Sequence, residues 1–120
     1  MSKRVASLLL EDILESVRNI EGYTRGLKQD AFEKDRKTID AVVRNFEIIG
    51  EAANSLPSSY RESHGEIEWQ QIIGLRNRII HEYFDVDVGI IWFIVENELA
   101  PLRVKVEKLL REEATGGDAV

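Results

Sequence analysis

The chain has 120 residues, 43% of them hydrophobic, which is the size of one domain with a single core. It contains no cysteine, and this excludes both a disulfide framework and a thiolate metal site. Its formal net charge of −6 excludes a chain-wide electrostatic footprint for nucleic acid, so any contact with RNA must come from a local basic patch or from assembly.

Two long helices are predicted in the first half of the chain. Apolar residues recur at helical spacing over residues 2–25. Asp30 is the predicted N-cap of a second helix over residues 31–54. Gly50 lies on the apolar stripe of that helix, where an interior glycine costs about 0.5–1 kcal/mol, and we therefore expect a neighbouring helix to approach closely there. The stripe consists of Ile39, Val42, Val43, Phe46, Ile49, Gly50 and Ala53.

A loop and a third helix follow. Residues 56–65 are punctuated by proline, serine and glycine, which predicts a loop with His64 at the surface. The third helix is predicted over residues 66–83. Asp85 and Asp87 are interpreted as N-caps of the next helix and not as a metal-binding pair, because no glycine-serine phosphate loop precedes them.

The fourth predicted helix starts with residues 89–95, which are apolar on every side and predict burial all round. Pro101 predicts a kink. The domain should comprise residues 1–113, and residues 114–120 are expected to be a disordered tail. The pattern predicts an all-α fold, an up-and-down four-helix bundle with room for a short extra helix. Its apolar surface exceeds what one small bundle hides, which predicts a homodimer.

One cluster breaks the apolar pattern of the third helix. Arg76 lies in the middle of the apolar arc, and Asn77 and His81 lie together on its flank. A buried cation is costly unless it is paired or faces a solvated cleft. Two interpretations stay open: an arginine that extends to the surface beside a histidine at the helix end, or a functional site. Glu47 and Glu51 are either a solvated acidic edge or carboxylate partners of Arg76.

The order of these residues resembles a known family. Arg76 is followed directly by Asn77, four residues separate Arg76 from His81, and Tyr83 stands two positions further on. With the upstream run NFEIIGEAA at residues 45–53, this order resembles the signature of HEPN-domain proteins. More narrowly, it is similar to HepT-type toxins that are encoded beside a minimal nucleotidyltransferase (MNT) antitoxin. The resemblance covers nearly the whole chain.

The resemblance implies a toxin–antitoxin system in which this chain is the ribonuclease and the MNT protein its antitoxin partner. The expected activity is metal-independent cleavage of RNA, either tRNA or mRNA, without a cofactor. Histidine can transfer protons near neutral pH, and arginine holds phosphate oxygens bidentately. We therefore assign proton transfer to His81, phosphate stabilisation to Arg76 and a supporting role to Asn77. By the resemblance, Tyr83 matches the tyrosine that the MNT partner modifies by AMPylation; the other interpretation is an aromatic side chain of the core stripe with its hydroxyl group at the cleft.

The spacing of the two catalytic candidates also bears on assembly. Arg76 and His81 are five residues apart, so on an ideal helix their directions diverge by about 140°. One protomer would not easily aim both at one phosphate, whereas a two-fold homodimer could gather both pairs in one cleft. The resemblance implies the same arrangement, because HEPN ribonucleases are taken to form their site at the dimer interface.

Two other functions are compatible with the sequence. One is a non-catalytic HEPN subunit that presents a nucleotide or substrate to a separate nucleotidyltransferase. The other is a dimeric helical scaffold. No apolar run approaches the ~18 residues of a membrane span, and residues 1–4 lack a signal pattern. We therefore expect a cytoplasmic protein without a membrane segment.

Overall fold

The computed structural model describes residues 3–82 and 87–118, and these form seven helices and no strand. The predicted all-α fold is confirmed. Across those residues, no helix is both long enough and apolar enough to span a membrane. The helices are α1 (Lys3–Thr24), α2 (Gln29–Lys34), α3 (Arg36–Ser55), α4 (Ser58–Ser63), α5 (Trp69–His81), α6 (Val88–Asn97) and α7 (Leu99–Asp118).

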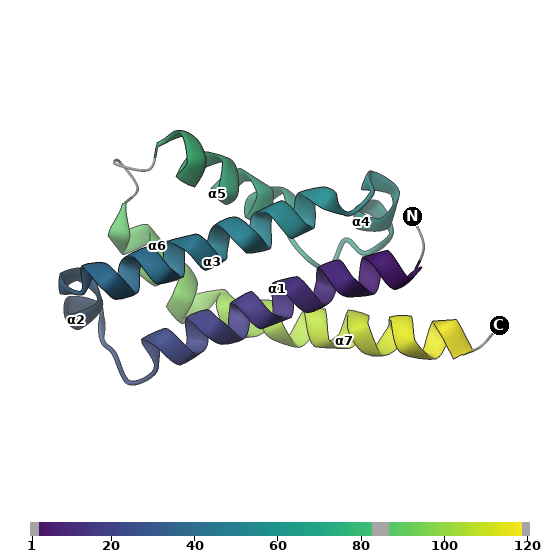
Figure 1. Ribbon diagram of the computed structural model, residues 1–120, viewed down its shortest axis with the longest axis horizontal. Coiled ribbons are helices and arrows are strands. Elements are labelled where there is room, and N and C mark those ends of the chain that lie inside the picture. The colour runs from purple at the N-terminus through teal and green to yellow at the C-terminus, as the bar shows by residue number, and fades with distance from the viewer. Residues whose placement is uncertain (1–2, 83–86, 119–120) are drawn as a thin grey trace.

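The longer helices lie side by side in a bundle (Figure 1). Helix α3 runs back along α1, and α5 runs back along α3 on the side away from α1. Helix α7 lies along the other side of α1, and α6 leads into it. The apolar stripe predicted for the second helix is buried at every position and faces this core. Helix α5 therefore packs mainly on α3, and this contact positions the candidate site.

The single helix predicted over residues 31–54 is divided at Asp35. Its backbone is not helical (φ −105°, ψ 85°), and its carboxylate accepts hydrogen bonds from the backbone N–H and the hydroxyl of Thr38, at 3.1 and 2.7 Å. Asp35 is thus the N-cap of α3. The prediction that Asp30 is the cap was wrong: Asp30 lies in the first turn of α2. The residues predicted as one helix therefore form the short α2 and the long α3, which meet at Asp35.

The fourth predicted helix is divided as well. Proline lacks an N–H, and its ring would clash with the carbonyl group four residues earlier, here that of Asn97. Helix α6 accordingly ends at Asn97, and Pro101 lies in the first turn of α7, where a missing N–H leaves no bond unmade. The expected kink is a break. Helix α7 continues to Asp118, beyond the predicted helix end at residue 113. The domain boundary and the disordered tail stay predictions.

The third predicted helix is shorter than expected. Helix α5 begins at Trp69 and ends at His81, and the segment before it contains the short α4 in the region predicted as loop. Asp87 caps α6, as predicted, by accepting a 2.8 Å hydrogen bond from the N–H of Gly89. Asp85 lies outside the described residues.

One burial prediction was wrong. The start of the fourth helix was expected to be buried all round, but within one chain Ile90 and Phe93 of α6 are 43% and 56% exposed. Ile91 and Trp92 of the same helix are buried, and the ring of Trp92 lies 5.1 Å from that of Phe32 in α2. Helix α6 covers the core with one face only and presents the other to solvent.

Candidate functional site

The site is built where α5 touches α3 most closely. A Cβ atom placed on Gly50 of α3 would overlap the Cβ of Arg76, and it would lie 2.8 Å from the Cγ of Arg76 and 3.1 Å from the carbonyl oxygen of Ile72. Only a residue without a side chain allows this contact. The close approach predicted at Gly50 is confirmed, and the helix that approaches is the one that carries Arg76.

The side chain of Arg76 is half-buried against α3. Its Nη1 donates a 3.0 Å hydrogen bond to the Oδ1 of Asn77. Its Nε is buried and has no hydrogen-bond partner among the described residues. The structure therefore brings Arg76 and Asn77 together, and the described residues satisfy the guanidinium only in part.

The arginines of α3 and α5 differ in their partners. Arg36 pairs with Asp40 and Arg78 with Glu82, at 3.2 and 3.3 Å. Arg44 pairs with Glu47 at 3.5 Å. Arg76 has no carboxylate partner in the part of the chain that the structure describes. Among the described arginines of these two helices, Arg76 is thus the one whose charge is available to an external anion.

The two carboxylates weighed as partners of Arg76 have other surroundings. Glu47 is engaged with Arg44, and Glu51 is exposed on α3. They form the solvated acidic edge, and the alternative of a Glu–Arg76 pair is not realised.

His81 is the last residue of α5 and is exposed. Together with Arg78 it places basic groups in the last turn, where they complement the negative end of the helix dipole. No hydrogen bond joins His81 to Arg76 among the described contacts. Tyr83, the candidate AMPylation residue, lies outside the described residues.

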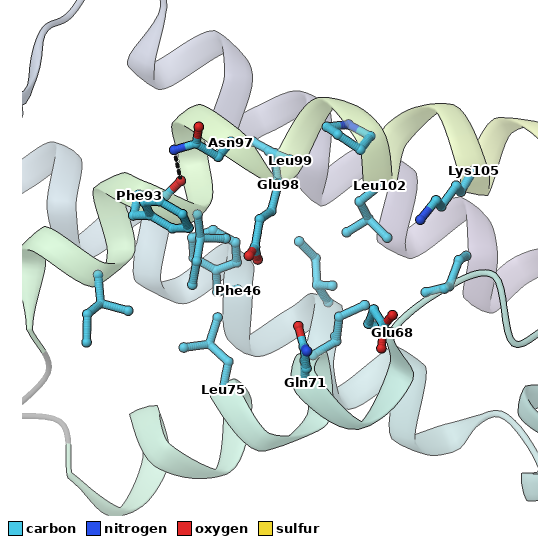
Figure 2. Close-up of a pocket in the computed structure, with 16 residues that line it drawn as sticks. Phe46, Glu68, Gln71, Leu75, Phe93, Asn97, Glu98, Leu99, Leu102 and Lys105 are labelled. Atoms are coloured by element: carbon cyan, nitrogen blue, oxygen red, sulfur yellow. Dashed lines mark hydrogen bonds between the residues drawn. The ribbon is translucent and has the colours of Figure 1, made fainter.

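An apolar groove of about 470 Å³ opens beside this helix (Figure 2). Helix α5 forms one wall with Leu75, and α6 and α7 form the opposite wall with Phe93 and Leu102. Phe46 of α3 contributes to the lining between them. Polar side chains also line the groove, namely Glu68, Gln71, Asn97, Glu98 and Lys105, and the carboxylate of Glu98 extends from the junction of α6 and α7 into the space between the two walls.

Sequence reasoning missed this groove. The half-exposed Ile90 and Phe93 both line it, so the apolar side of α6 that one chain leaves uncovered is the same side that forms the groove wall. The available signal was the all-round apolar character of residues 89–95. Within the described residues, no three histidine, aspartate or glutamate side chains gather where they could hold a metal ion.

Comparisons with known proteins concern almost the whole chain. The model of the family described as "Ribonuclease HepT-like" matches residues 13–109 of the chain. The chain is 41% identical over 107 residues to a Thermococcus cleftensis protein named "Probable ribonuclease HepT", covering 89% of this chain and 97% of that protein. It is 38% identical over 104 residues to a protein of Caldanaerobacter subterraneus that is named as a candidate RNase. This match covers 87% of this chain and 93% of that protein.

A third relative is longer. The chain is 36% identical over 110 residues to a Methanocaldococcus jannaschii protein whose name joins gamma-glutamylcyclotransferase with a candidate RNase. The match covers 92% of this chain and 50% of that protein. No solved structure is a significant match.

Proposed function

The chain belongs to the HepT-like ribonuclease family, and from this premise we propose that it is the toxin ribonuclease of a toxin–antitoxin pair in the cytoplasm. It cleaves RNA without a metal ion, and a nucleotidyltransferase of the MNT type is its antitoxin. The observation that carries this proposal is the environment of Arg76. A half-buried guanidinium without a carboxylate partner among the described residues is suited to bind a phosphate.

The proposed reaction is an attack of the ribose 2′-oxygen on the adjacent phosphorus. A base removes the 2′-hydroxyl proton, the bond from phosphorus to the 5′-oxygen breaks, and an acid protonates that oxygen. The products carry a 2′,3′-cyclic phosphate and a 5′-hydroxyl. His81 transfers protons, Arg76 stabilises the charge on the phosphoryl oxygens, and Asn77 orients Arg76 through their hydrogen bond.

The site is composite and belongs to a homodimer of the helical bundle, in which the long helices alternate in direction. On an ideal helix the five-residue spacing turns Arg76 and His81 about 140° apart, which favours a site whose groups come from two copies of α5. The apolar groove supports this arrangement, because α5 forms one of its walls. The exposed Phe93 and Ile90 lie at the opposite wall. In a two-fold dimer, these side chains of each copy could pack into the groove of the other copy, because a two-fold interface uses the same surface twice.

The first test uses Arg76→Ala and His81→Ala, with Arg78→Ala as the matched control on the same helix. We expect each of the first two changes to abolish growth arrest on expression and to lower cleavage of RNA by roughly 10²–10⁴-fold. Arg78 is exposed and paired with Glu82, so its removal should change the rate by less than about threefold.

The measurement is cleavage of labelled RNA in the presence of EDTA, with the product ends identified by mass spectrometry. Full activity of both Arg76→Ala and His81→Ala would reject the catalytic assignment. A tightly bound nucleotide without RNA cleavage would favour the alternative, a non-catalytic HEPN subunit that serves a nucleotidyltransferase.

The proposed neutralisation acts on Tyr83 and rests on the family resemblance. Added AMP would bring bulk and negative phosphate to the proposed cleft and so exclude RNA. Incubation of the chain with its MNT partner and ATP should add AMP mass to the wild type and remove its cleavage activity. Tyr83→Phe should stay unlabelled and active, whereas Tyr23→Phe should be labelled like the wild type. Equal labelling of Tyr83→Phe would contradict the assignment.

A further inference from the structure

We propose that Gly50 of α3 is a positioning residue for Arg76. The absence of a side chain at this position creates a seat on α3 that fixes the stem of Arg76 and with it the direction of the guanidinium. The proposal rests on the proposed phosphate-binding role of Arg76. It assigns a part in that role to a residue on a different helix, 26 positions away in the sequence.

The atoms around Gly50 cannot move aside one by one. The position that a Cβ would take overlaps the Cβ of Arg76, which is fixed to the backbone of α5. A third neighbour, at 3.1 Å, is the backbone carbonyl oxygen of Ile72, one turn earlier on α5. Contacts with Cβ and backbone atoms are relieved only by a shift of the helix. A side chain on residue 50 must therefore push α5 away as a body.

The seat restrains the arginine itself. The Cβ and Cγ of Arg76 lie against Gly50, its Nε is buried, and its Nη1 is bonded to Asn77. These restraints act on successive parts of one long side chain, which in solvent samples many rotamers. A guanidinium that is held in advance loses less conformational freedom when it binds the reacting phosphate. Alanine forms helices better than glycine, so helix propensity gives no reason for a glycine here.

Gly74 supplies the matched control. It lies on α5, two residues before Arg76, and a Cβ placed on it would meet no atom within 4 Å. Gly50→Ala and Gly74→Ala make the same chemical change in two adjoining helices, but only the first enters the seat. A difference between the two variants therefore reports the seat and not the loss of a glycine.

The first measurement follows the arginine Nε–H groups by ¹⁵N NMR. In the wild type, the Nε–H of Arg76 should exchange with water more slowly than that of Arg78, whose side chain is 58% exposed. Gly50→Ala should shift the Arg76 signal and speed its exchange, and Gly74→Ala should leave it unchanged. Equal exchange of Arg76 and Arg78 in the wild type overturns the proposal, and this result does not depend on RNA cleavage or on the folding of a variant.

The second measurement is RNA cleavage. Gly50→Ala should lower kcat/KM by about 10–100-fold, as a displacement on the order of 1 Å does, while Gly74→Ala stays within about twofold. Added to Arg76→Ala, the Gly50→Ala change should cause a much smaller loss than it causes in the wild type, because most of its effect acts through the guanidinium. A further loss of similar size, or full activity of Gly50→Ala, overturns the proposal. A wild type that cleaves no RNA refutes the proposed function and leaves the NMR result to decide on the seat.

Discussion

Tyr60 on α4 has a hydroxyl group that is buried without a hydrogen-bond partner among the described residues. Its ring stacks on that of His64, with centroids 4.1 Å apart, and the ring Nδ1 of His64 lies 2.8 Å from the carbonyl oxygen of Tyr60. Burial and, next, the carboxylate of Glu113 raise the pKa of Tyr60 well above its usual value of 10.0. This hydroxyl group therefore links the stability of the fold to pH on the alkaline side.

The sign of this linkage gives a prediction. Above a pH of about 10 the unfolded chain releases the Tyr60 proton while the folded chain keeps it, so the free energy of unfolding should fall as the pH rises. Tyr60→Phe should remove this part of the decline and cost little near neutral pH. Urea unfolding at about pH 8 and about pH 11 measures the effect. The control is Tyr23→Phe, because Tyr23 is 47% exposed, and equal declines in the wild type and Tyr60→Phe would contradict the prediction.

Asn45 illustrates how a motif residue can serve the fold. It belongs to the run at residues 45–53 that carries the family resemblance, and it is buried. Its Nδ2 donates to the carbonyl oxygen of Ala41 at 2.8 Å, and its Oδ1 accepts from the Nδ2 of Asn19 at 3.2 Å. Asn45 thus joins α3 to α1 and satisfies its polar atoms inside the core. In the same run, Gly50 faces α5 and the candidate site.

At the scale of helices, the bundle is joined by two kinds of contact. Helices α3 and α5 meet through close packing at Gly50. Helices α1 and α7 meet through packing and a group of ion pairs. Arg103 of α7 pairs with Glu21 of α1 at 3.1 Å and with Glu107 of α7 at 3.5 Å. Glu107 also pairs with Arg18 of α1 at 3.2 Å. These pairs are partly exposed and contribute modestly to stability. The close α3–α5 contact at Gly50 lies under the candidate site. The α1–α7 contact, with its partly exposed ion pairs, lies on the far side of α1.

The helix boundaries depend on competition between neighbouring signals. The predicted cap was Asp30, but Asp35 is the residue that starts α3. Continuing the helix through Asp35 would compete with its two hydrogen bonds to Thr38. At Pro101, the missing N–H is tolerated in a first turn but not in a helix interior. Both breaks are therefore local effects: the one at Asp35 was not predicted, and the one at Pro101 was expected as a kink.

At the scale of the molecule, the exposed groove predicts the oligomeric state. The wild type should have twice the chain mass of 13.7 kDa in solution by light scattering. Phe93→Asp should dissociate the dimer, because it removes about 1.5–3 kcal/mol of apolar burial per copy and would bury a charge. The control is Val104→Asp, which alters an equally exposed apolar residue on α7 outside the groove.

The same variants connect assembly to activity. If the site is composite, RNA cleavage should fall with the dimer fraction in Phe93→Asp and recover in part at high protein concentration. Val104→Asp should stay dimeric and active. A monomeric wild type that cleaves RNA at full rate would refute the composite site while leaving Arg76 as a candidate within one chain.

The sequence by itself determined the all-helical fold, the apolar stripe of α3, the need for a small residue at Gly50 and the candidate cluster around Arg76. Each follows from periodicity and residue chemistry along one helix. Only the tertiary structure decided that α5 is the helix seated on Gly50, that no described carboxylate pairs with Arg76, and that Phe93 borders an open groove. These facts depend on which helix faces which, and the spacing of residues along one helix carries no information about its neighbours.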